Sequence, residues 1–119
     1  MKGKFNLNAK FKHVLIENRY ISEITLAELK FGVENSAKQE KNRKALEDFL
    51  TGIQIIPIFH SLDLYAKEKA RLRKSGTPID DFDLLIGVTS VNHDLTMVTN
   101  NLNHFNKING IDLEDWTTD

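Results

Sequence analysis

The stretch DDFDLLIGVTSVN (residues 80–92), followed by LTMVT (residues 95–99), sets the fold of this chain. Asp80 or Asp81 is a typical helix N-cap. The apolar residues that follow run nearly all round a helix, so we expect a buried helix that ends near Asn92. The second run predicts a buried strand. This succession of helix and strand is one unit of an alternation that extends in both directions.

Outward from this stretch, helices and strands alternate along the whole chain. We expect helices over 7–16, from Thr25, over 36–52 and over 61–76, and strands at 20–22, 53–59 and 111–116. Pro57 predicts that strand 53–59 lies at a sheet edge or ends early. The spacing suits parallel crossovers, so the pattern predicts an α/β fold with a small parallel sheet.

Composition narrows the class of protein. The 119 residues carry a net charge of -1, are 40% hydrophobic and include no cysteine. This length is one domain. The absence of cysteine excludes disulfides, thiolate zinc sites and cysteine nucleophiles, and the charge excludes a protein that coats nucleic acid by bulk charge. No apolar run approaches the ~20 residues of a membrane span, and the N-terminal residues are too polar for a signal peptide. We therefore expect a soluble, cytoplasmic protein.

Three acids at the start of the buried helix form the first candidate site. One of Asp80, Asp81 and Asp83 would suffice as a cap, and first-turn acids also suit the helix dipole. Three of them repel one another, and a bound cation relieves that repulsion. The run therefore indicates a metal or catalytic site as the alternative to simple capping.

Two further polar positions have competing interpretations. Thr25-Leu26-Ala27-Glu28 fits a capping box, which explains Glu28 structurally; the alternative is a metal-ligand carboxylate. Thr99, Asn100 and Asn101 follow a predicted strand, where parallel sheets bind ligands, or they form a turn.

Basic residues and histidines are less specific. Lys67, Arg71 and Lys74 share one helical face, and a second basic group spans 38–44. Each group is either a solvated face or a phosphate-binding patch. The histidines show no metal-binding spacing, so we expect surface or core roles for His13, His60, His93 and His104. No serine-hydrolase elbow or phosphate-cradling loop is present.

Three motifs in order resemble those of a known family. ISEITLAELKFGV (residues 21–33) resembles the second acidic motif of PIN-domain proteins, and GTPIDDFDLLIG (residues 76–87) resembles the third. Residues 95–105 and 110–116 resemble the C-terminal end of the family. Among its members the chain is most similar to VapC-type toxins of bacterial toxin–antitoxin pairs.

The resemblance implies a three-layer sandwich around a small parallel sheet and an endoribonuclease that depends on Mg²⁺ or Mn²⁺. Glu28 and Asp83 match the acids that bind the metal. Asp81 and Asn101 match accessory positions, where they would position water or a second metal, and Thr99 belongs to the same motif. Lys67, Arg71 and Lys74 would guide RNA. The implied partners are a small antitoxin protein and a second copy of the chain.

One departure from the family is expected to matter. The family begins with a central strand that ends in Asp-Thr-Asn, whose Asp is the first metal ligand. This chain shows no such element, and no Asp precedes Glu17. We therefore expect an N-terminally incomplete PIN-like domain over 1–119, either a shortened sequence or a truncated protein. Two alternatives follow: a catalytically impaired module that only binds the antitoxin or dimerises, and an unrelated small α/β binding domain.

Overall fold

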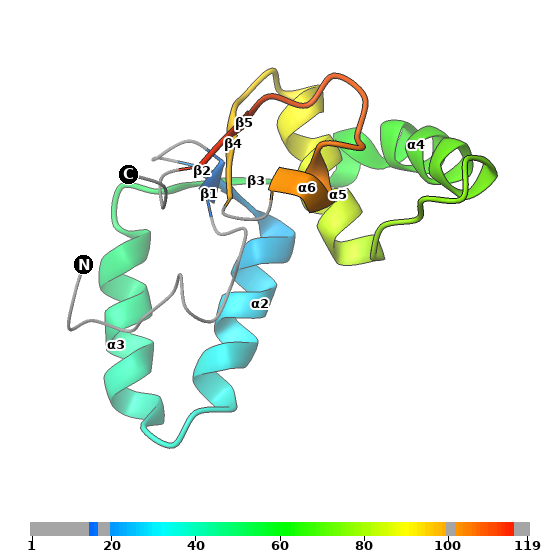
Figure 1. Cartoon of the computed structure of the whole chain (residues 1–119). Coiled ribbons are helices and arrows are strands. Elements are labelled where there is room, and N and C mark those ends of the chain that lie inside the picture. The colour runs from blue at the N-terminus through cyan, green and yellow to red at the C-terminus, as the bar shows by residue number, and fades with distance from the viewer. Residues whose placement is uncertain (1–14, 17–19, 100–101, 116–119) are drawn as a thin grey trace.

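The computed structural model describes residues 15–16, 20–99 and 102–115. Helices and short strands alternate along them, as the sequence predicts (Figure 1). In chain order, the elements are β1 (Leu15–Ile16), β2 (Tyr20–Ser22), α2 (Glu23–Glu34), α3 (Gln39–Leu50), β3 (Gln54–Ile56), the 3₁₀ turn η1 (Phe59–Ser61), α4 (Leu62–Lys74), α5 (Asp81–Asn92), β4 (Met97–Val98), α6 (Leu102–Phe105) and β5 (Leu113–Glu114).

The strands form one sheet in the order β3-β2-β1-β4-β5. β2 pairs with β3 in parallel, and β4 pairs with β5 in parallel. β1 lies between these two pairs and is antiparallel to both β2 and β4. The four outer strands therefore run in one direction, and their carboxyl ends share one edge of the sheet. The predicted parallel pairing is confirmed for both outer pairs, and β3 lies at an edge, as Pro57 predicts.

The centre of the sheet differs from the expectation. Residues 15–16 form β1, so the helix predicted over 7–16 is wrong at its C-terminal end, and residues 7–14 lie outside the described part of the chain. We expected the chain to lack the family's central parallel strand. In the structure, β1 occupies the centre of the sheet and is antiparallel to its neighbours. β1 pairs with Tyr20 on one side and with Met97 and Val98 on the other. This pairing supplies partners for backbone N–H and C=O groups, and its stabilisation outweighs the helical periodicity of the sequence.

Helix α2 begins earlier than the capping box predicts. Ser22 is the N-cap, and its Oγ atom accepts hydrogen bonds from the backbone N–H groups of Ile24 and Thr25 at 3.0 and 3.2 Å. The predicted start at Thr25 is therefore wrong. Ser22 is the last residue of β2, so the chain enters the helix directly from the strand. Glu23 also links the start of α2 to the segment after β3, because its Oε1 atom accepts a hydrogen bond from the Ile58 N–H at 2.9 Å.

Ser36-Ala37-Lys38-Gln39 also fits a capping box, and its prediction that a helix starts at Ser36 is wrong. Helix α3 has Lys38 as its N-cap, without a side-chain hydrogen bond. The Ser36 hydroxyl instead donates to the Val33 carbonyl at 2.7 Å, at the end of the preceding helix. The predicted ends of two helices are confirmed, because Gly52 and Gly76 follow α3 and α4 with φ of 82° and 76°.

Helix α5 matches its prediction at both ends. Asp80 is the N-cap and accepts the Phe82 N–H at 3.2 Å, and the helix ends at Asn92. Its middle is buried, and it packs against α2, α4, α6 and η1. The strand predicted over 95–99 forms only at Met97–Val98, and the one predicted over 111–116 forms at Leu113–Glu114.

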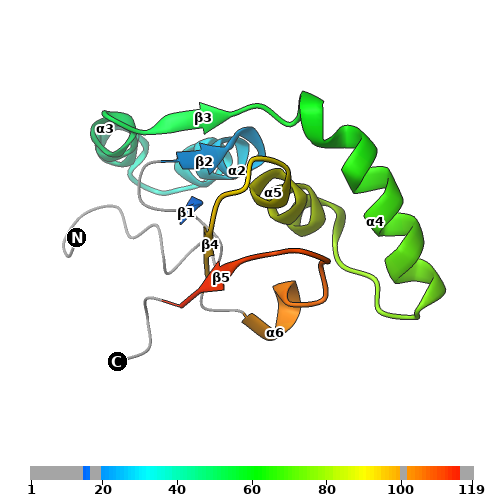
Figure 2. The same ribbon diagram turned by 90° about the horizontal axis from the view of Figure 1, so that it is seen from above.

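Two apolar clusters hold the elements together. One joins α4, α5, β4 and α6, and the other joins β2, α2 and α3. Figures 1 and 2 show α2 and α3 extending from one part of the sheet and α4–α6 from another. Helix α2 links the clusters, because its Ile24 packs against the first and its Leu29 and Val33 lie in the second.

Candidate functional site

The elements that carry the candidate residues meet at the carboxyl edge of the sheet. Helix α2 follows β2 directly, and Thr99 follows β4. Helix α5 packs against α2, and α6 packs against α5 (Figure 1). Glu28 and Asp83 are far apart in sequence, yet they lie on two helices in contact, and Thr99 directly follows β4.

Asp83 lies in the first turn of α5 and faces α6. Its Oδ2 atom is 2.8 Å from Nε2 of His104, and the Asp83 side chain is only 19% exposed. The His104 ring packs edge-on against Phe105, with 5.0 Å between the ring centroids, and Phe105 is fully buried. The apolar core therefore fixes the imidazole that contacts this carboxylate.

Glu28 lies in the middle of α2, so a capping box does not explain it. Ser22 supplies the cap. The Oε1 atom of Glu28 is buried, as is the hydroxyl of Thr25 one turn earlier. A buried carboxylate oxygen belongs where a cation or hydrogen-bond donors face it. The capping explanation for Glu28 is thereby removed.

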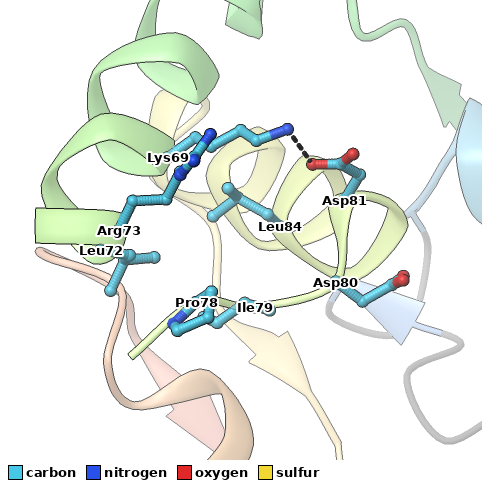
Figure 3. Close-up of a pocket in the computed structure, with 8 residues that line it drawn as sticks. All are labelled: Lys69, Leu72, Arg73, Pro78, Ile79, Asp80, Asp81 and Leu84. Carbon is cyan, nitrogen blue, oxygen red and sulfur yellow. Dashed lines mark ion pairs between the residues drawn. The ribbon is translucent and has the colours of Figure 1, made fainter. Parts of the chain in front are cut away.

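Asp81 faces away from Asp83, toward α4. Its Oδ1 atom lies 2.9 Å from the Lys69 ammonium and accepts the Tyr65 hydroxyl hydrogen bond at 2.8 Å (Figure 3). The Lys69 ammonium, followed by the Tyr65 hydroxyl, holds the pKa of the Asp81 carboxyl below its usual value. In turn, hydrogen bonding to Asp81, followed by that to Tyr65, raises the pKa of the Lys69 ammonium. Asp81 therefore joins α5 to α4 in this structure.

Two of the predicted residues, Glu28 and Asp83, are suited to bind a metal ion. In the described part of the chain, no three His, Asp or Glu side chains lie close enough to form a metal site. Mg²⁺ is usually held by one or two carboxylates together with water. Glu28 and Asp83 supply such carboxylates from two helices in contact, so their chemistry fits Mg²⁺ or Mn²⁺. Asn101, the fourth predicted site residue, lies outside the described residues, as does Asn100.

The predicted basic face of α4 is partly engaged within the protein. Both guanidinium donors Nε and Nη2 of Arg71 contact the Glu68 carboxylate, at 2.9 and 2.7 Å, and Nη2 also donates to the Lys107 carbonyl. Lys67 and Lys74 make no ion pair with any residue in the described ranges. In the second basic group, Arg43 pairs with Glu34 and Glu40.

Sequence reasoning missed the residues that contact the acids. His104 was expected to be a surface or core residue, and nothing in its local sequence distinguishes it. Tyr65, Lys69 and Arg73 recur every four residues, which places them on one face of α4. That spacing is a usable signal, because an aromatic hydroxyl and two cations on one helical face fit an acidic neighbour. The His60 carbonyl accepts a hydrogen bond from the Asn92 side chain, and His93 Nδ1 lies 3.0 Å from the Thr89 carbonyl.

Comparison with known proteins gives consistent matches over most of the chain. A family model described as PIN domain matches residues 4–111. The tRNA(fMet)-specific endonuclease VapC of Salmonella typhimurium is 32% identical over 117 residues, which cover 98% of this chain and 83% of the relative. Ribonuclease VapC2 of Rickettsia felis is 38% identical over 97 residues, which cover 81% and 72%.

Solved structures show the same similarity in three dimensions. The Rickettsia felis VapBC2 complex, bound to a DNA fragment from its promoter, matches with a TM-score of 0.77 and 37% identity, over 82% of this chain and 74% of the other. DNA-bound VapBC from Salmonella typhimurium matches with a TM-score of 0.78 and 34% identity, over 94% and 80%. Among the described residues, no helix is long and apolar enough to span a membrane.

Proposed function

The chain belongs to the PIN-domain family, and from that premise we propose that it is a VapC-type ribonuclease toxin that an antitoxin protein neutralises. Relatives that are named as ribonucleases cover nearly all of the chain, and related structures are complexes of a toxin with its antitoxin. RNA cleavage by such an enzyme takes place in the cytoplasm. A second copy of the chain completes the proposed set of partners.

One structural observation carries the assignment of the site. Other residues cap α2 and α5, namely Ser22 and Asp80, so capping explains neither Glu28 nor Asp83. Both acids are half-buried or more, on helices that pack together. We propose that these two carboxylates hold a divalent metal ion, Mg²⁺ or Mn²⁺. Such an ion, when bound, stabilises negative charge on the phosphate that is cleaved.

The remaining predicted residues have supporting roles in this proposal. Asn101 helps to position water or a second metal ion, whereas Asp81 holds α5 against α4 through Lys69 and Tyr65. Lys67 and Lys74 contribute positive charge for RNA, and Arg71 lies beside them on α4. His104 orients Asp83, because its ring nitrogen contacts one oxygen of this carboxylate.

The test is metal-dependent RNA cleavage by the purified chain and by its Asp83→Asn variant. The wild type should cleave RNA with Mg²⁺ or Mn²⁺ and stop when EDTA is added. Asp83→Asn removes one anionic ligand at almost constant volume, so the rate should fall by about 10²–10³-fold. Asp48→Asn, at an exposed position on α3, is the matched control and should cleave at the wild-type rate.

Each result bears on a different part of the proposal. A wild type that cleaves no RNA with either metal contradicts the enzymatic function. Cleavage that survives Asp83→Asn undiminished contradicts the site assignment alone.

A catalytically impaired module is the second candidate function. The observation that favours it is the absence of a three-donor metal group among the described residues. The two candidates differ in metal binding, because a ligand that binds only the folded state raises the free energy of unfolding. A protein with a working metal site should have a higher melting temperature in Mn²⁺. The melting temperature of an impaired module that only binds the antitoxin or dimerises should not change with Mn²⁺.

A further inference from the structure

A pocket of about 420 Å³ lies between α4 and the start of α5. Leu72, Ile79 and Leu84 are buried and form its apolar floor, and Pro78 lies at its exposed rim (Figure 3). We call it the α4–α5 pocket. An apolar floor of this kind accepts a flat ring, because apolar contact and stacking do not depend on the ring's polar edges.

The charges around the α4–α5 pocket leave one cation available. Lys69 and Asp81 neutralise each other at 2.9 Å. The Asp80 carboxylate accepts the Phe82 N–H, and Figure 3 shows it pointing away from the Arg73 side of the pocket. Arg73 is exposed and makes no ion pair within residues 15–16, 20–99 and 102–115. A guanidinium is suited to a phosphate, which it binds through paired N–H donors.

The α4–α5 pocket and the proposed metal site share the first turn of α5. Asp81 lines the pocket, and Asp83, two residues later, faces His104. Two such positions on a helix lie about 5.4 Å apart at Cα and point to nearly opposite sides. The α4–α5 pocket and the proposed metal site therefore lie on two sides of the start of α5, and an RNA strand that crosses this helix end reaches both.

We propose that the α4–α5 pocket binds a nucleotide of the RNA substrate, with its phosphate at Arg73 and its base against Pro78 and Ile79. This subsite rests on the proposed ribonuclease function. Base contact with an apolar wall and phosphate contact with a cation together are typical of single-stranded nucleic-acid binding. The Lys69–Asp81–Tyr65 contacts hold the wall of the pocket in place.

The test measures RNA binding without cleavage. A short fluorescein-labelled single-stranded RNA is titrated with wild type, Arg73→Gln and Lys44→Gln in EDTA, and Kd is measured by anisotropy at several salt concentrations. Arg73→Gln should raise Kd about tenfold and lower the salt slope by about one. Lys44→Gln removes the same charge from exposed α3 and should change neither quantity. An unchanged Kd and slope in Arg73→Gln overturns the subsite, provided that its melting temperature matches the wild type.

Two further measurements separate the possible outcomes. A nucleoside 5′-monophosphate should displace the RNA at a lower concentration than inorganic phosphate, and equal potency overturns the base contact.

With Mg²⁺ or Mn²⁺, Arg73→Gln should raise KM and leave kcat within about twofold, because Arg73 binds substrate away from the reacting phosphate. If the wild type cleaves RNA and Arg73→Gln matches its KM, the subsite fails and the ribonuclease function stands. If RNA binding depends on Arg73 but no metal supports cleavage, the function fails and the subsite stands.

Discussion

Asp80, Asp81 and Asp83 lie within four consecutive positions of the sequence but have different partners. Asp80 caps α5, Asp81 contacts Lys69 and Tyr65 on α4, and Asp83 contacts His104 on α6. Each residue of a helix is turned by about 100° from the one before, so acids two positions apart point in nearly opposite directions. The mutual repulsion that the sequence suggests is therefore relieved largely by separation.

At the residue scale, His104 gives the first prediction. We expect His104→Ala to weaken Mn²⁺ binding by about 10–100-fold, because partners that orient a ligating carboxylate contribute this much to metal affinity. His104→Gln keeps a hydrogen-bond donor and should restore part of the affinity. Isothermal titration with Mn²⁺ measures both variants. Equal affinity in wild type and His104→Ala would show that Asp83 needs no orienting partner.

At the element scale, the start of α2 is set by the strand before it. Ser22 is completely buried and serves both as the last residue of β2 and as the cap of α2. The capping-box patterns predict Thr25 and Ser36 as caps, although Ser22 is also a small hydroxyl residue of the kind that caps helices. The parallel register of β2 with β3, which pairs Ser22 with Ile56, ends the strand at Ser22 and so selects it.

We expect Ser22→Ala to lower the free energy of unfolding by about 1–2 kcal/mol, the usual contribution of a side-chain cap. Ser36→Ala is the matched control, because Ser36 stands in a capping-box sequence but caps no helix. Its effect should stay below about 0.5 kcal/mol, as at most surface positions. Urea unfolding followed by circular dichroism measures both. Equal losses would mean that the cap at Ser22 contributes nothing of its own.

At the scale of the whole molecule, Glu68 joins α4 to the segment before β5. Its carboxylate binds the Arg71 guanidinium and accepts the Asn109 N–H at 2.9 Å, while Arg71 reaches the Lys107 carbonyl. Glu68 is only 5% exposed. The Arg71 hydrogen bonds, together with the Asn109 N–H, hold the pKa of the Glu68 carboxyl below its usual value, against the opposing effect of burial.

This lowered pKa has a defined consequence for stability. The Glu68 contribution is complete above about pH 4.3, the ordinary value for Glu, and is lost as the pH falls through the lower folded pKa. Glu68→Gln should cost about 1–3 kcal/mol of unfolding free energy at pH 7. The difference from wild type should shrink below pH 4.3, in denaturant unfolding measured from pH 7 to pH 3. Glu47→Gln, exposed on α3, should show no such change. A pH-independent difference would place the contribution of Glu68 in packing alone.

The sequence by itself determined the features that depend on local pattern. These are the α/β class, the bounds and cap of α5, the glycine ends of α3 and α4, the edge position of β3 and the motifs that carry Glu28 and Asp83. The fold features follow from periodic burial or from a residue that a cap or turn requires, and the motifs were identified by their resemblance to those of the PIN-domain family. Such signals lie within a few residues of one another, so a single chain suffices to read them.

Only the tertiary structure decided which distant groups meet. It placed residues 15–16 as an antiparallel strand between β2 and β4, set the start of α2 at Ser22, paired Asp83 with His104 and engaged Arg71 with Glu68. Local propensities differ by less than about 1 kcal/mol per residue, and strand pairing, burial and charge-assisted hydrogen bonds exceed that amount. These stronger contacts join residues that are far apart in the sequence, and no local pattern records them.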